Sequence, residues 1–325
     1  LEDPEFVDAR IKFDGKKYKA KVRLKGDLSD HWLAKNRMSL RINLKNGNTI
    51  LGFNKFSLQK PRTRQYPYDQ AFQDSLRDLG NIAANHSYAT VSLNGEDWGL
   101  MNIEEHFSKE FLEKQQIKDS LVFRFSDDKK WLQFNLDFLP NGAMIERNDH
   151  SNYRYSDPKL ISSIIEEDKY LNSLINRKRY SYVLEQRLKK EHASLYSMEH
   201  HMKAFFATLF WNNNHTLGVN NSRYYFNPYT LKLEPITTDQ EMFSLQLEDF
   251  QTSLDRLTLT ETYKQVLSHF QSNALKDKFF NETEKSFLKV AEKLNQSNYL
   301  FPLDAHKDDK IIKKKSLLSV LYFDG

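Results

Sequence analysis

The sequence predicts an α+β protein of two lobes, a strand-rich first lobe and a mainly helical second lobe. Alternating polar and apolar residues dominate the first third of the chain, helical spacing dominates from Pro158 onward, and one strand pair is embedded in the helical part. We therefore divide the chain into residues 1–112 and 113–325, and we expect a cleft between the two lobes.

Composition sets limits on the class of protein. The chain has 325 residues, of which 39% are hydrophobic, with 48 Lys and Arg against 44 Asp and Glu. These values exclude a disordered chain, and no apolar run reaches the roughly 18 residues of a membrane helix. The absence of cysteine excludes a disulfide scaffold, a thiolate zinc site and a cysteine nucleophile. The acidic start is unlike a signal peptide, and we expect a mature fragment or part of a longer chain.

The first lobe contains the strand signals. Residues 17–25 alternate strictly, with Tyr18, Ala20, Val22 and Leu24 on the apolar face. Turn residues at Asn46-Gly47 and Asn94-Gly95 predict hairpins. The remaining strands are expected at 38–44, 49–51, 53–58, 88–93 and 98–103. One helix is expected at 69–79, ended by Gly80, and a shorter one at 107–116.

The second lobe changes to helical spacing. Its most apolar segment, 197–210, predicts a buried helix. A strand pair is expected at 223–227 and 231–236. The other expected elements are strands at 121–125 and 131–138, helices between 158 and 211, and amphipathic helices at 254–270 and 280–294.

Several catalytic signatures are missing. The sequence has no GxxxxGK[ST], GxGxxG, GxSxG or HExxH pattern, which removes the support for a P-loop, a dinucleotide fold, an esterase or a metalloprotease. The adjacent pair His200-His201 lies in an apolar helical pattern. We interpret it as two helix residues, because metal-binding histidines on one helix face are spaced i, i+4.

Residues 212–241 gather amides and carboxylates at the end of the expected buried helix and around the strand pair. Asp239 follows the returning strand directly. Oxygen ligands at strand ends suit a hard cation such as Mg²⁺. The competing interpretation is that the asparagines form turns and Asp239 caps a helix.

A row of cations follows one face of the strand at 17–25. Lys17, Lys19, Lys21, Arg23 and Lys25 share this face. Five like charges repel one another, which calls for solvent or an anionic partner. Arg37 and Arg41 on the next strand favour a sheet that contacts phosphate, and a solvated face is the alternative.

Together these regions resemble the spore-coat protein H (CotH) kinase-like family. The resemblance covers roughly residues 20 to 245. It rests on four segments in order: Val22-Arg-Leu-Lys-Gly-Asp27 with Arg37-Met-Ser-Leu-Arg41, Phe56-Ser-Leu-Gln59, Val91 to Glu105, and His215 to Asp239, which includes Asn221-Ser-Arg-Tyr-Tyr-Phe-Asn-Pro228.

The resemblance implies an atypical protein-kinase-like fold with an ATP site between the lobes. It implies that Arg23 and Lys25 face the nucleotide phosphates, with Arg37 nearby, and that Glu105 lies at the lobe junction. It further implies Mg²⁺ or Mn²⁺ held by Asn221 and Asp239, with Glu241 at the second acidic position. CotH-like proteins are often exported or attached to the cell surface, so the resemblance also favours that location.

The sequence departs from the family where a catalytic carboxylate is usual. Residues 213–216 read Asn-Asn-His-Thr, so His215 is the candidate base, since its ordinary pKa suits proton transfer near neutral pH. Two functions therefore stay open. One is an ATP- and Mg²⁺-dependent kinase acting on protein Ser/Thr or a surface carbohydrate, and the other is a non-catalytic binding or assembly module of the cell surface. Nucleic-acid binding through residues 17–25 and 307–315 is a third, less favoured hypothesis.

Overall fold

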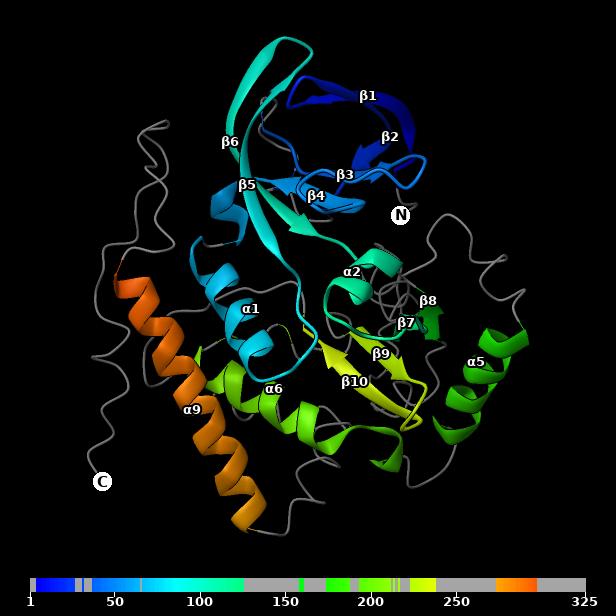
Figure 1. The fold of residues 1–325 in the computed structure, drawn as a ribbon, viewed down its shortest axis with the longest axis vertical. Coiled ribbons are helices and arrows are strands. Elements are labelled where there is room, and N and C mark those ends of the chain that lie inside the picture. The colour runs from blue at the N-terminus through cyan, green and yellow to red at the C-terminus, as the bar shows by residue number, and fades with distance from the viewer. Residues whose placement is uncertain are drawn as a thin grey trace, which may run out of the picture.

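The computed structural model describes residues 4–26, 31, 37–64, 66–125, 158–160, 174–187, 193–211, 213, 216, 223–237 and 273–296. These residues form a mixed α+β structure with two antiparallel sheets and several helices (Figure 1). The α+β prediction is confirmed. No helix in the described ranges is both long and apolar enough to cross a membrane.

The first sheet has six antiparallel strands in the order β1-β2-β3-β4-β6-β5. They are β1 (Val7–Phe13), β2 (Lys16–Leu24), β3 (Leu40–Leu44), β4 (Lys55–Gln59), β5 (His86–Leu93) and β6 (Glu96–Glu105). Tight turns join β1 to β2 and β5 to β6, and the sheet curls around an apolar core. That core includes Ala20, Ile42, Phe56, Leu58, Trp98 and Ile103.

One hairpin turn of this sheet follows from local sequence. Asn94 and Gly95 both adopt positive φ, at 52° and 88°, which the twist of a two-residue hairpin requires. This confirms the predicted hairpin. The prediction of a return strand at 49–51 is wrong, because Ile50 forms only an isolated bridge with Phe53 and β4 begins at Lys55. Leu51 and Gly52 take positive φ there, which interrupts strand geometry.

Helix α1 (Tyr68–Asp78) lies within one residue of its predicted position. Gly80 ends it with φ of 81°, its amide donating to the Arg77 carbonyl at 3.0 Å while the Asn81 amide donates to the Leu76 carbonyl at 2.9 Å. This pair of bonds is the Schellman arrangement, which places glycine just beyond a helix end.

The second sheet has the order β10-β9-β7-β8. Its strands are β7 (Val122–Phe125), β8 (Pro158–Leu160), β9 (Arg223–Asn227) and β10 (Lys232–Ile236), and the predicted strand pair at 223–236 is confirmed. Other elements are the helices α2 (Lys109–Lys114) and α5 (Leu174–Arg187) and the 3₁₀ turns η2 (Pro61–Arg64) and η4 (Ala193–Leu195).

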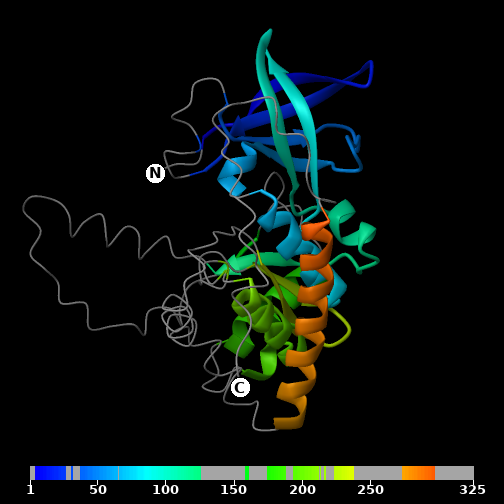
Figure 2. The same ribbon diagram turned by 90° about the vertical axis from the view of Figure 1, so that its left-hand side faces the viewer.

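Helix α1 packs against the helices of the second half of the chain, α6 (Met198–Phe210) and α9 (Asn273–Asn295) (Figures 1 and 2). Their common core contains Phe72 and Leu76 of α1, Trp211 after α6, and Phe287 of α9, each fully buried. Thus α1 connects the six-stranded sheet to the helices. The buried helix expected at 197–210 is confirmed, and the segments expected at 131–138 and 254–270 lie outside the described residues.

Candidate functional site

One face of the six-stranded sheet is polar although much of it is buried. Strand register determines which side chains share it, because directly opposed residues in antiparallel strands point the same way. Ser57, Gln59 and Asn102 on this face are each no more than 1% exposed. The first row across the face is Arg23, Arg41, Ser57, Glu104 and His86. The second row is Lys25, Ser39, Gln59, Asn102 and Tyr88.

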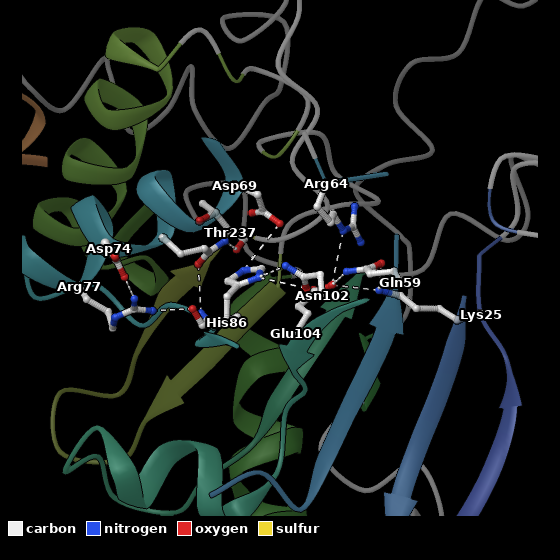
Figure 3. A network of polar contacts seen from close by, with 12 residues as sticks. Lys25, Gln59, Arg64, Asp69, Asp74, Arg77, His86, Asn102, Glu104 and Thr237 are labelled. Carbon is white, nitrogen blue, oxygen red and sulfur yellow. Dashed lines mark hydrogen bonds and ion pairs between the residues drawn. The ribbon is translucent and has the colours of Figure 1, made fainter. Parts of the chain in front are cut away.

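Glu104 is the centre of this face (Figure 3). Its Oε2 lies 3.1 Å from Lys25 Nζ and 3.4 Å from Arg64 Nε, and it accepts a hydrogen bond from Gln59 Nε2. Lys25 Nζ also donates to Gln59 Oε1 at 3.2 Å. The side chains of Lys25 and Glu104 are each only 13% exposed, so the ion pair is largely shielded from water.

The charges around Glu104 determine its protonation. Burial acts to raise the pKa of Glu104, but Lys25, Arg64, His86 and Arg41 together hold that pKa well below its usual range. Glu104 is therefore a carboxylate at neutral pH. Among the described residues, three basic side chains, Lys25, Arg41 and Arg64, act on this one carboxylate. Such a site has the charge to hold an anion such as phosphate.

His86 extends the network toward α1. Its Nδ1 lies 3.1 Å from Asn102 Nδ2, and its Nε2 lies 3.6 Å from the Asp69 carboxylate. Burial lowers the pKa of His86 to about 4, so the ring is neutral at pH 7. If Asn102 Nδ2 donates to Nδ1, the ring proton is on Nε2 and faces Asp69.

Gln73 of α1 links the segment before β5 to the second sheet. Its Nε2 donates to the Thr237 carbonyl at 3.2 Å, and its Oε1 accepts from the Ala84 amide at 3.0 Å. Thr237 directly follows β10 and is itself buried. Figure 3 shows Thr237 near Asp69 and His86, at one end of the group of polar side chains that has Lys25 and Glu104 at its other end. The end of β10 is therefore held beside the polar face.

The structure brings one of the predicted phosphate-facing residues into this centre. Lys25 lies in it, and Arg23 lies two residues earlier on the same face, opposite Arg41. The Arg23 guanidinium also lies over the Phe6 ring, 5.3 Å from its centroid. Arg37 is close to β6, where its Nη2 donates to the Leu100 carbonyl at 2.7 Å.

Glu105 lies at the end of β6, on the opposite face from Glu104. Its Oε1 is 3.2 Å from Lys114 Nζ, and its Oε2 accepts from Asn85 Nδ2 at 2.5 Å. Burial raises the pKa of Glu105, and the contacts with Asn85 and Lys114 only partly offset this. Glu105 is thus a junction residue between β6 and α2, and its neighbour Glu104 pairs with Lys25.

The other predicted site residues, His215, Asn221, Asp239 and Glu241, lie outside the described residues. In the part of the chain that the structure does describe, no group of three or more His, Asp or Glu residues is arranged to hold a metal ion. A test of the expected metal ligands therefore depends on binding measurements.

Sequence reasoning missed Glu104, Gln59, Arg64 and the Asp69–His86 pair. The signal for Glu104 was the strand alternation itself, because Asn102 and Glu104 share one face while Met101, Ile103 and Glu105 share the other. Arg64 and Asp69 reach the face from a 3₁₀ turn and a helix, and strand periodicity carries no signal for such positions.

Comparison of the sequence with family models and with curated proteins identifies no relative. No family model matches the chain, and no curated protein sequence is significantly similar to it.

Proposed function

We propose that the protein is a CotH-like kinase or phosphotransferase that uses ATP with Mg²⁺ or Mn²⁺. The observation that carries this proposal is the shielded Lys25–Glu104 ion pair, on a polar face beside which Gln73 holds the end of β10. A lysine held by a glutamate, close to metal-binding acidic residues, is the arrangement with which kinases position nucleotide phosphates.

The cations of the polar face fit the phosphate part of the nucleotide. Lys25 is oriented by Glu104 and Gln59, so its ammonium group is fixed before an anion arrives. Arg64 approaches the same carboxylate oxygen from η2, and Arg41 lies opposite Ser57 in the adjacent row. Cations that are already fixed in place stabilise the negative charge of a phosphoryl group during its transfer, because they need no reorganisation during the reaction.

The position of Thr237 supports the metal part of the proposal. Gln73 holds this residue beside the network, and Asp239 follows two residues later in the sequence. In the proposed function Asp239, Asn221 and Glu241 hold the metal ion, which neutralises phosphate charge when bound.

One sequence observation favours the second candidate, a non-catalytic binding or assembly module at the cell surface. Residues 213–216 contain no carboxylate to accept the proton of an acceptor hydroxyl. In the catalytic form of the proposal, His215 accepts that proton, and the acceptor is a protein Ser/Thr or a surface carbohydrate. The two candidates share the nucleotide site and differ in turnover.

The first test is calorimetric titration of ATP, with Mg²⁺ or Mn²⁺, into the wild type and two lysine variants. We expect Lys25→Ala to weaken ATP binding roughly 10- to 100-fold, because it removes a charge-assisted contact worth about 1.5–3 kcal/mol. Lys17→Ala is the matched control, since Lys17 is exposed on the same face of β2. Equal, small effects of both variants in folded proteins would refute the phosphate site.

Asp239→Asn tests the metal part in the same assay. We expect it to abolish the metal dependence of ATP binding while the unfolding transition stays at its wild-type position. Unchanged metal-dependent binding in the folded variant would remove Asp239 from the site. If nucleotide binding is present, ADP formation with candidate acceptors then decides between the kinase and the non-catalytic module.

A further inference from the structure

The β1–β2 hairpin carries a cationic surface that the proposed nucleotide site does not use. Strand register places Arg10 directly opposite Lys19 and Lys12 directly opposite Lys17. All four side chains are exposed and point to the same side of the hairpin. We call these four residues the hairpin cations.

Their surroundings do not neutralise them. Asp8 lies on the same face, but it pairs with Lys45 at 2.5 Å and faces Lys21 across the strands. Among the described residues, the side chains of the hairpin cations have no ion-pair or hydrogen-bond partner. Like charges placed directly opposite each other in a sheet are destabilising. The arrangement therefore becomes favourable when an anion lies across it.

The spacing of the cations is that of an extended strand. Residues two apart on one face of a strand are separated by about 6.8 Å, and opposed residues on adjacent strands by about 5 Å. An extended peptide with an acidic residue at every second position repeats its carboxylates with the same period. The hairpin therefore matches such a peptide along its length.

The position of β1 favours a polypeptide over a nucleic acid. Among the described strands β1 is at the edge of its sheet, so its outer backbone groups can pair with an added strand. The aromatic residues of the two strands, Phe13 and Tyr18, pack against the core on the other face. On the cationic face, β1 and β2 themselves carry no aromatic residue, and the Phe6 ring just before β1 has the Arg23 guanidinium over it, 5.3 Å from its centroid. Successive bases would therefore find no row of stacking platforms like that of single-strand nucleic-acid binders.

We propose that the β1–β2 hairpin docks an acidic polypeptide segment in extended form, which adds to the edge of β1 and places its carboxylates beside Arg10 and Lys12, with the long side chains of Lys17 and Lys19 reaching toward them from β2. This inference does not depend on the proposed phosphotransfer, because docking is measured without nucleotide or metal. The cationic row continues along β2 to Arg23 and Lys25, so a docked segment points toward the polar face.

The test is fluorescence anisotropy with a labelled peptide of alternating Glu and Thr, long enough to cover β1. We compare the whole chain with the double variant Arg10→Gln/Lys19→Gln. The control is Lys285→Gln/Lys293→Gln, which removes the same charge from exposed positions of α9. We expect the hairpin variant to weaken binding roughly tenfold and the control to leave it unchanged. Binding is also expected to weaken as salt is added.

Three further probes decide the class of partner. A peptide of alternating Gln and Thr is expected not to bind, and an acidic peptide N-methylated at alternate amides is expected to bind more weakly because it cannot complete the strand pairing. Tighter binding of a single-stranded oligonucleotide or of anionic vesicles to the hairpin would overturn the proposal in favour of those partners. Equal losses of peptide affinity in the hairpin and α9 variants would also overturn the proposal, because binding would then depend only on net charge. If the acidic peptide does not bind the wild-type chain, the proposal is likewise overturned.

Because removing like-charge repulsion does not threaten the fold, the hairpin variant stays interpretable. We expect its unfolding midpoint to be equal to or above that of the wild type. A loss of peptide binding in a variant of undiminished stability therefore reports on the surface itself.

Discussion

Replacing Glu104 with glutamine removes the single carboxylate on which the polar face is centred, while keeping nearly the same shape. The substituted amide can still accept a hydrogen bond, but it no longer neutralises Lys25 and Arg64, whose nitrogens lie 3.1 and 3.4 Å from Oε2 in the wild type. The variant therefore tests the effect of the negative charge separately from the effect of side-chain packing. A destabilisation is expected because two shielded cations lose their shared counter-charge.

The size of the effect follows from distance and exposure. At an effective dielectric constant of about 20, each of the two contacts corresponds to roughly 5 kcal/mol of gross Coulomb energy. Hydration and relaxation of the remaining cations offset much of this, and breaking a buried ion pair typically costs about 3–5 kcal/mol. Since Glu104 and Lys25 are each 13% exposed, we take the lower end. The expected loss is about 3 kcal/mol.

Urea unfolding at neutral pH measures this loss, and a cycle with Lys25→Met isolates the pair. The double variant is expected to be more stable than the sum of the single losses predicts, by about 1 kcal/mol or more. Glu113→Gln is the control, because its pair with Lys109 is more than half exposed on both sides, and we expect no measurable change. A loss below about 0.5 kcal/mol for Glu104→Gln would refute the assignment of a shielded ion pair.

Two other predictions concern the groups around this centre. Burial lowers the pKa of His86 from 6.5 to about 4, so between these two pH values the unfolded chain binds a proton that the folded chain does not. The neutral ring therefore contributes up to about 3 kcal/mol to the free energy of unfolding. This contribution is fully present above pH 6.5 and is lost as the pH falls to about 4. His86→Asn should flatten the pH dependence of the urea midpoint in that window, and an unchanged slope would contradict the neutral buried ring. Gln73→Leu should lower the free energy of unfolding by about 2 kcal/mol, because the Thr237 carbonyl and the Ala84 amide lose this partner. Urea unfolding measures the change, and a curve equal to that of the wild type would show that neither hydrogen bond contributes to stability.

Local signals made much of the fold predictable. The Asn94-Gly95 turn, the apolar stripe of α1 with Gly80 behind it, and the apolar run of α6 are each encoded within a few residues. The return strand after Asn46-Gly47 was wrong because the backbone turns again at Leu51 and Gly52, and the paired segment begins only at Lys55. Turn residues mark that the chain reverses, but register determines where pairing resumes.

The site was less predictable because it is assembled across the sheet. Alternation placed Lys25 on the correct face of β2, since that depends on one strand alone. Its partner is 79 positions away, and the choice between Glu104 and Glu105 depends on the register of β6 against β4. A shift of one residue exchanges the faces of a strand. The adjacent carboxylates Glu104 and Glu105 therefore have opposite surroundings, one between cations and one beside Asn85 and Lys114.

The burial of so many polar groups on one face argues for a ligand-binding role. A sheet that only needed stability would place apolar residues there, because a buried ion pair contributes no more than well-packed hydrophobic side chains of similar volume. Here Gln59 and Asn102 are almost fully buried between charged neighbours, and the opposite face of the same strands already supplies an apolar core. The same strand, β2, continues the cations outward to the exposed hairpin. Inner cations fixed by Glu104 suit the binding of a phosphate, whereas exposed cations attract an anionic partner over a longer range. In the two proposals made above, the inner cations would position a phosphate and the outer cations would capture an acidic segment.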